Sequence, residues 1–157
     1  MQWNVYYTLD QINSWLDSLV ATHRNVASIV KGGESYEKRD IRGIRISHGT
    51  GKRAIFIEAG IHSREWISPA SACYLINELL NSQNSDIRAA ARDFDWYIFP
   101  IFNPDGYVWS HEQVLRQNIF IKNIVCFFIS SLYLNKNYNF SSACGVKTDV
   151  LLAIISV

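Results

Sequence analysis

The chain has little excess charge of either sign. Its 157 residues carry 15 lysines and arginines and 14 aspartates and glutamates, which gives a formal net charge of +1. A surface with so little net charge lacks the electrostatic attraction that draws proteins to nucleic acid or to an anionic membrane. We therefore expect no nucleic-acid partner.

Cysteines and long apolar runs are also scarce. Cys73, Cys126 and Cys144 show no metal-knuckle spacing, and an odd number of cysteines leaves any disulfide framework incomplete. Cys73 lies in a helical pattern and is expected to be buried. The apolar stretch 123–134 is bounded by Lys122 and Asn135 and is shorter than the roughly 20 residues that a membrane-spanning helix needs. A membrane anchor there is the least favoured interpretation, and no signal peptide is visible at the amino terminus.

The pattern of apolar residues predicts an α/β fold. Thr8 and Gln11 fit a capping box ahead of a helix whose apolar residues recur at helical spacing. The stretch "AIFIEA" has no polar residue until Glu58, which is typical of a strand covered on both faces. Further strands are predicted over 26–30, 40–47 and 94–102, with helices after 68 and over 85–93. This alternation predicts a largely buried sheet.

Turn and capping residues mark three of the connections between the predicted helices and strands. Residues 48–53 are predicted to be a hairpin connection between two strands. Ser68 and Pro69 fit the N-cap and first position of a helix. The sequence "NPDGY", residues 103–107, predicts a turn that ends the strand before it.

A histidine, an arginine and a glutamate follow directly on the buried strand. His62 and Glu65 carry side-chain types that bind zinc, and ligand sites in α/β sheets lie beyond the carboxyl ends of strands. Arg64 between them could bind a carboxylate or a carbonyl oxygen. The same residues also fit an ordinary helix start, with Glu65 favoured by the helix dipole. From these residues alone, both interpretations stay open.

Two longer stretches of the sequence resemble a known protein family. "FIEAGIHSREWISPA" and, about thirty residues later, "FDWYIFPIFNPDGY" closely resemble the zinc metallocarboxypeptidases of the carboxypeptidase A and B family, peptidase family M14. The resemblance runs from about Trp3 to Gln113. It implies a mixed, largely buried sheet with helices on both faces, one Zn²⁺ ion bound by His62 and Glu65, and a substrate-binding Arg64. It also implies peptide or protein C-termini as substrates and an extracellular location.

The resemblance stops after Gln113. The family's third zinc ligand, a later histidine, has no counterpart, nor do its catalytic glutamate and the groups that bind the substrate carboxylate. His23, His48 and His111 are expected to be solvated surface residues rather than ligands. We interpret residues 1–113 as the N-terminal portion of a catalytic domain. Residues 114–157 are interpreted as an unrelated tail that is not the native continuation.

This division predicts a truncated domain that is incomplete and inactive as written, with an unpaired sheet edge. Its substrate preference stays open between the A-like choice of apolar terminal residues and the B-like choice of basic ones. The alternative is a non-catalytic fragment that binds peptide or a protein partner.

Overall fold

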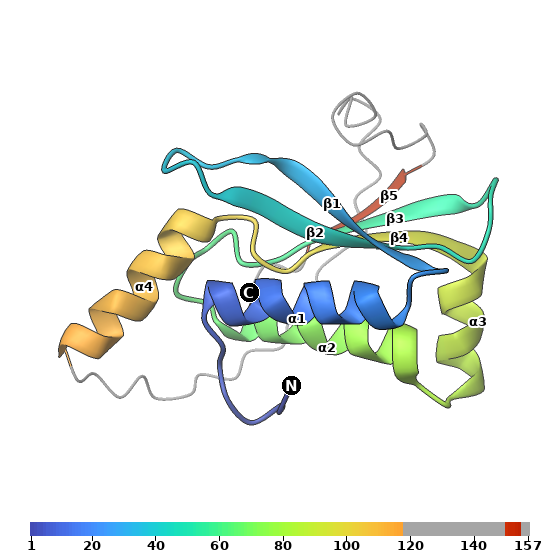
Figure 1. The fold of residues 1–157 in the computed structure, drawn as a ribbon, viewed down its shortest axis with the longest axis horizontal. Helices are drawn as coiled ribbons and strands as arrows, with labels where there is room; N and C mark the ends of the chain where they lie inside the picture. Colours follow the sequence, from blue (N-terminus) through green and yellow to red (C-terminus); the bar gives the residue numbers. More distant parts are fainter. Residues whose placement is uncertain (118–149, 155–157) are drawn as a thin grey trace.

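The computed structural model describes residues 1–117 and 150–154. Helices and strands alternate along the chain as the apolar pattern predicts (Figure 1). In chain order they are α1 (Leu9–Thr22), β1 (Ala27–Glu34), β2 (Asp40–Ile46), β3 (Arg53–Glu58), α2 (Ile67–Asn81), α3 (Ser85–Asp93), β4 (Phe94–Phe99), α4 (Pro104–Gln117) and β5 (Val150–Ile154).

The strands form one mixed sheet in the order β1-β2-β4-β3-β5. β2 is antiparallel to both β1 and β4, whereas β3 is parallel to β4 and β5. The mixed α/β class is therefore confirmed. The predicted hairpin at residues 48–53 is wrong, because β4 lies between β2 and β3 and pairs with both. The loop from β2 to β3 has to pass across the end of β4.

Both central strands bury their two faces. Along β3, Ile55 and Ile57 pack into the core beneath the sheet, and Ala54 and Phe56 pack into a second cluster on the other face. The residues of β4 alternate in the same way because successive side chains of a strand point to opposite faces. The prediction of a strand covered on both faces is thus confirmed for β3.

Helices α1 and α2 lie on one face of the sheet (Figure 1). The capping box predicted for α1 is present, with the Thr8 hydroxyl and the Gln11 side chain each bonding the other residue's backbone. Cys73 of α2 is buried as expected, and desolvation raises the pKa of its thiol to about 12. A layer of helices on the other face is not seen among the described residues and stays a prediction.

The outer edge of β3 is not unpaired, contrary to the expectation for a truncated sheet. β5 adds to it in parallel register, from Ala54 opposite Val150 to Glu58 opposite Ile154. The segment Val150–Ile154 therefore supplies a second neighbour for β3. The stretch 123–134, with Cys126, and also Cys144 lie outside the described residues.

Two helix boundaries differ from the predicted ones. Helix α2 begins at Ile67 after Trp66, and the Ser68 hydroxyl accepts a hydrogen bond from the Gly60 amide at 3.2 Å instead of capping the helix. Residues 103–107 do not form an isolated turn, because Pro104 opens α4. Among the described helices, none is long and apolar enough to cross a membrane.

Candidate metal centre

The turn between β3 and α2 brings His62 and Glu65 together. The His62 Nδ1 atom lies 3.1 Å from the Glu65 Oε2 atom, and the two side chains are 62% and 34% exposed. Backbone hydrogen bonds curl the turn, since the Glu65 amide donates to the His62 carbonyl at 3.1 Å. A spacing of three residues therefore places an imidazole and a carboxylate on the same side of the turn, open to solvent.

Gly60 is the point where the chain leaves the sheet for this turn. Its φ of +67° lies in the left-handed region that favours glycine. A Cβ atom at this position would lie 3.0 Å from the Pro69 side chain and 3.1 Å from the Pro100 carbonyl oxygen. Just before it, the Ala59 amide donates to the Phe99 carbonyl at 2.9 Å. The turn therefore starts from a fixed position beside the end of β4.

Arg64 extends from the turn toward α4. Its guanidinium carbon lies 5.2 Å from the centre of the Trp109 ring, and both side chains are exposed. A cation over an aromatic face is favourable by about 0.5–1 kcal/mol at exposed sites. In the described part of the chain, no carboxylate forms an ion pair with Arg64. Its N–H groups are therefore available to a ligand.

Trp66 and His111 form a contact that the sequence did not predict. Their rings stack with centroids 4.0 Å apart and planes 9° apart. The Trp66 indole N–H also donates to the Ser110 hydroxyl at 2.9 Å. The expectation that His111 is solvated is wrong, because burial lowers its pKa and its Nε2 atom is buried without a hydrogen-bond partner among the described residues. His48, by contrast, is exposed as expected.

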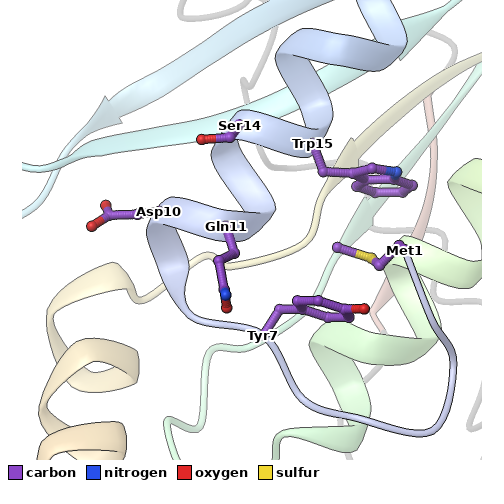
Figure 2. A pocket seen from close by; sticks show the side chains of 6 residues that line it. All are labelled: Met1, Tyr7, Asp10, Gln11, Ser14 and Trp15. Carbon is purple, nitrogen blue, oxygen red and sulfur yellow. The ribbon is translucent and has the colours of Figure 1, made fainter.

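A separate cavity lies between the N-terminal segment and α1 (Figure 2). Its volume is about 380 Å³, and it is lined by Met1, Tyr7, Asp10, Gln11, Ser14 and Trp15. None of His62, Arg64 or Glu65 lines it. The candidate metal centre is thus the exposed turn and not this cavity.

Comparison with known proteins identifies the family of this chain. A family model for zinc carboxypeptidases matches residues 12–147. The chain belongs to the zinc carboxypeptidase family. It is 53% identical over 106 residues to a zinc carboxypeptidase of Simulium vittatum, covering 68% of this chain and 35% of that protein. It is 44% identical over 110 residues to zinc carboxypeptidase A 1 of Anopheles gambiae, covering 70% and 25% respectively.

A solved structure shows the same relationship. The crystal structure of carboxypeptidase A from Helicoverpa armigera matches with a TM-score of 0.65 and 29% identity, over 71% of this chain and 28% of that one. The chain therefore spans about a quarter to a third of the length of the zinc carboxypeptidases that it matches. The residues that the family model matches include the turn that carries His62 and Glu65.

The two donor atoms suit the zinc ion that the family implies. A tetrahedral zinc with bonds of about 2.0–2.2 Å holds its ligand atoms about 3.3–3.6 Å apart. The 3.1 Å between His62 Nδ1 and Glu65 Oε2 is within a few tenths of an ångström of that separation. Within the described residues no group of three histidine, cysteine, aspartate or glutamate side chains comes together, so His111 does not complete the pair.

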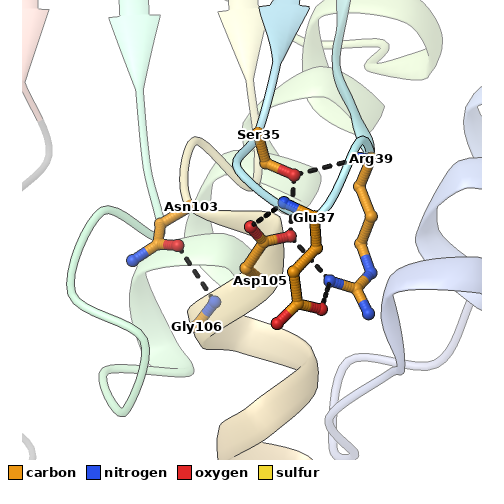
Figure 3. A network of polar contacts seen from close by, with 6 residues as sticks. All are labelled: Ser35, Glu37, Arg39, Asn103, Asp105 and Gly106. Atoms are coloured by element: carbon orange, nitrogen blue, oxygen red, sulfur yellow. Dashed lines mark hydrogen bonds and ion pairs between the residues drawn. The ribbon is translucent and has the colours of Figure 1, made fainter.

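Asp105, at the start of α4, anchors this end of the zinc carboxypeptidase fold. Its carboxylate accepts hydrogen bonds from the Ser35 hydroxyl at 2.7 Å and from the Glu37 amide at 2.9 Å (Figure 3). It also forms an ion pair with the Arg39 guanidinium at 2.6 Å. One carboxylate thus joins α4 to the turn between β1 and β2. The sequence motif "NPDGY" pointed to this position but not to its partners.

The protonation of Asp105 should make this anchor sensitive to acid. Partial desolvation would raise the pKa of Asp105, but the hydrogen bonds from Glu37, Ser35 and Arg39 outweigh it and hold the pKa below its ordinary value of 3.8. A depressed pKa stabilises the fold above that ordinary value, and the stabilisation is lost as the pH falls through the folded-state pKa. We expect the difference in unfolding free energy between wild type and Asp105→Asn to be constant above about pH 5 and to shrink below it. Urea unfolding between pH 7 and pH 3 measures this, and a difference that grows toward low pH would contradict it.

Proposed function

We propose that this chain carries the first part of a metallocarboxypeptidase zinc site, in which His62 and Glu65 bind Zn²⁺. The observation that carries the proposal is the 3.1 Å approach of His62 Nδ1 to Glu65 Oε2 on a solvent-exposed turn. Zinc, when bound, supplies a Lewis acid that polarises a peptide carbonyl and acidifies a water molecule. His62 binds as a neutral imidazole and Glu65 as a carboxylate, so both side chains must have lost their protons.

Arg64 is proposed to bind the backbone of the peptide substrate. Its guanidinium is planar and offers several N–H donors, which suits a peptide carbonyl or a carboxylate. The contact with Trp109 restricts where the guanidinium can lie while leaving its edge available. The substrate class that follows from the family is a peptide or protein with a free C-terminus.

We further propose that residues 1–113 act as the N-terminal portion of the catalytic domain and that the chain as written does not catalyse hydrolysis. Two protein ligands are fewer than the three that a catalytic zinc usually has. No described residue stands beside the pair as a third ligand. Residues 114–157 are then a tail that does not supply the remaining catalytic groups.

The test combines zinc binding with peptide hydrolysis on the same protein. We expect zinc to bind to the wild-type chain and no release of C-terminal amino acids from peptides ending in apolar or basic residues. Absence of zinc binding would contradict the proposed ligand pair. Release of C-terminal residues would contradict the proposed inactivity. Peptide binding without release would favour the alternative of a non-catalytic peptide-binding fragment.

A further inference from the structure

Asn103 bridges the start of α4 and the turn that carries the proposed zinc ligands. Its Oδ1 atom accepts a hydrogen bond from the Gly106 amide at 3.0 Å, which is the bond of a helix N-cap (Figure 3). Because the oxygen is committed to that N–H, the amide nitrogen faces the other way. It donates to the Ile61 carbonyl at 3.2 Å, and Ile61 directly precedes His62.

The first turn of α4 also packs against the ligand turn itself. A Cβ atom on Gly106 would lie 2.8 Å from the Ser63 Cβ atom and 2.7 Å from the Asn103 Nδ2 atom. Real Cβ atoms do not approach that closely, so only glycine lets the helix lie against Ser63. Asn103, just before α4, thus bonds the backbone on one side of His62, and Gly106 in the first turn of α4 lies against the Ser63 side chain on the other.

The end of α4 that makes these contacts is itself held in place. Asp105 binds the turn between β1 and β2, as described above. Tyr107 is buried, and its hydroxyl donates to the Tyr7 carbonyl at 2.7 Å. Asn103 is thus attached to a rigid support, whereas His62 is mostly exposed and has little packing to fix its position.

From this arrangement we propose that Asn103 is a positioning residue for zinc binding. It acts through the Ile61 carbonyl to hold the backbone of residues 61–65 where His62 and Glu65 can share one ion. Residues that do not touch the metal but orient its ligands typically contribute 10–100-fold to metal affinity. The inference rests on the proposed zinc-binding function, and it adds a residue for which no role in that function follows from the sequence.

The decisive variant is Asn103→Ser. Serine caps helices about as well as asparagine, so the bond to the Gly106 amide can be replaced. A serine side chain is too short to reach the Ile61 carbonyl as well. We expect Asn103→Ser to raise the Kd for zinc by roughly tenfold. Its melting temperature should stay close to that of the wild type. Zinc affinity is measured by competition with a chromogenic chelator.

The control is Thr8→Ala, which removes the cap of α1 and lowers stability without touching the ligand turn. It should lower the melting temperature and leave zinc affinity unchanged. An Asn103→Ser protein that binds zinc as tightly as wild type would overturn the inference, as would an equal loss of affinity in Thr8→Ala. Failure of the wild type to bind zinc would instead show that the proposed function is wrong.

Amide hydrogen exchange on the zinc-free protein tests the positioning step directly. The Glu65 amide, which donates to the His62 carbonyl, should exchange faster in Asn103→Ser than in wild type. The same amide in Thr8→Ala should exchange at the wild-type rate once global unfolding is taken into account. Unchanged exchange at Glu65 in Asn103→Ser would overturn the inference even if zinc affinity falls.

Discussion

Replacing His62 with alanine is expected to weaken zinc binding by more than about 100-fold, since losing a ligand costs more than losing a residue that orients one. The imidazole is one of only two proposed ligands among the described residues, so the remaining carboxylate cannot hold the ion alone. His62 is 62% exposed and fills no core, and we therefore expect the melting temperature of the zinc-free protein to change little. Chelator competition and thermal unfolding measure the two effects.

The matched control for this prediction is His48→Ala. His48 is also an exposed histidine, but it lies in the loop between β2 and β3. Its replacement should leave zinc affinity unchanged. Glu65→Gln keeps the size of the side chain but removes its charge. Like His62→Ala, it should weaken zinc binding. Equal zinc affinity in wild type and His62→Ala would exclude this turn as the metal centre.

Replacing Phe99 with alanine is expected to lower the free energy of unfolding by about 3–5 kcal/mol. Phe99 ends the central strand β4 and is fully buried. Its ring lies over Gly43, where a Cβ atom would come within 2.7 Å of it, and it packs 5.3 Å from the Phe56 ring. Removing the ring leaves a cavity that these neighbours cannot easily fill, because the glycine has no side chain to move into it.

Tyr36→Ala is the control for the loss of an aromatic ring. Tyr36 is 97% exposed, and its replacement should change stability by no more than about 0.5 kcal/mol. Urea unfolding of both variants measures the difference. A loss in Phe99→Ala no larger than that in Tyr36→Ala would mean that the second face of the sheet contributes little to the stability of this chain.

Sequence patterns correctly predicted the elements that depend on residues close together in the chain. The capping box of α1 depends on Thr8 and Gln11, which are three residues apart, and it forms as predicted. The buried strand β3 was recognised because four consecutive apolar residues need cover on both faces. The location of His62 and Glu65 at its carboxyl end followed from the same pattern. Their assignment as zinc ligands came from the family resemblance and remains a proposal.

Features that depend on distant partners were missed. The hairpin prediction for residues 48–53 failed because β4, more than forty residues later in the chain, pairs with both β2 and β3. The first four residues of "NPDGY" favour a turn, but Asp105 bonds residues of the turn between β1 and β2, and Tyr107 bonds Tyr7. These contacts stabilise a helix. No local pattern identifies those partners.

The place of β4 in the sheet also sets an order of assembly during synthesis. β1 and β2 can pair as soon as both have left the ribosome, but β3 has no permanent neighbour until Phe94–Phe99 has followed it. The turn at residues 61–65 gains its support from Asn103 later still. Pairings between distant segments form slowly because a long loop must first be closed. The turn that carries the proposed zinc ligands is therefore among the last parts of the described fold to become ordered, after the chain has been made past residue 106.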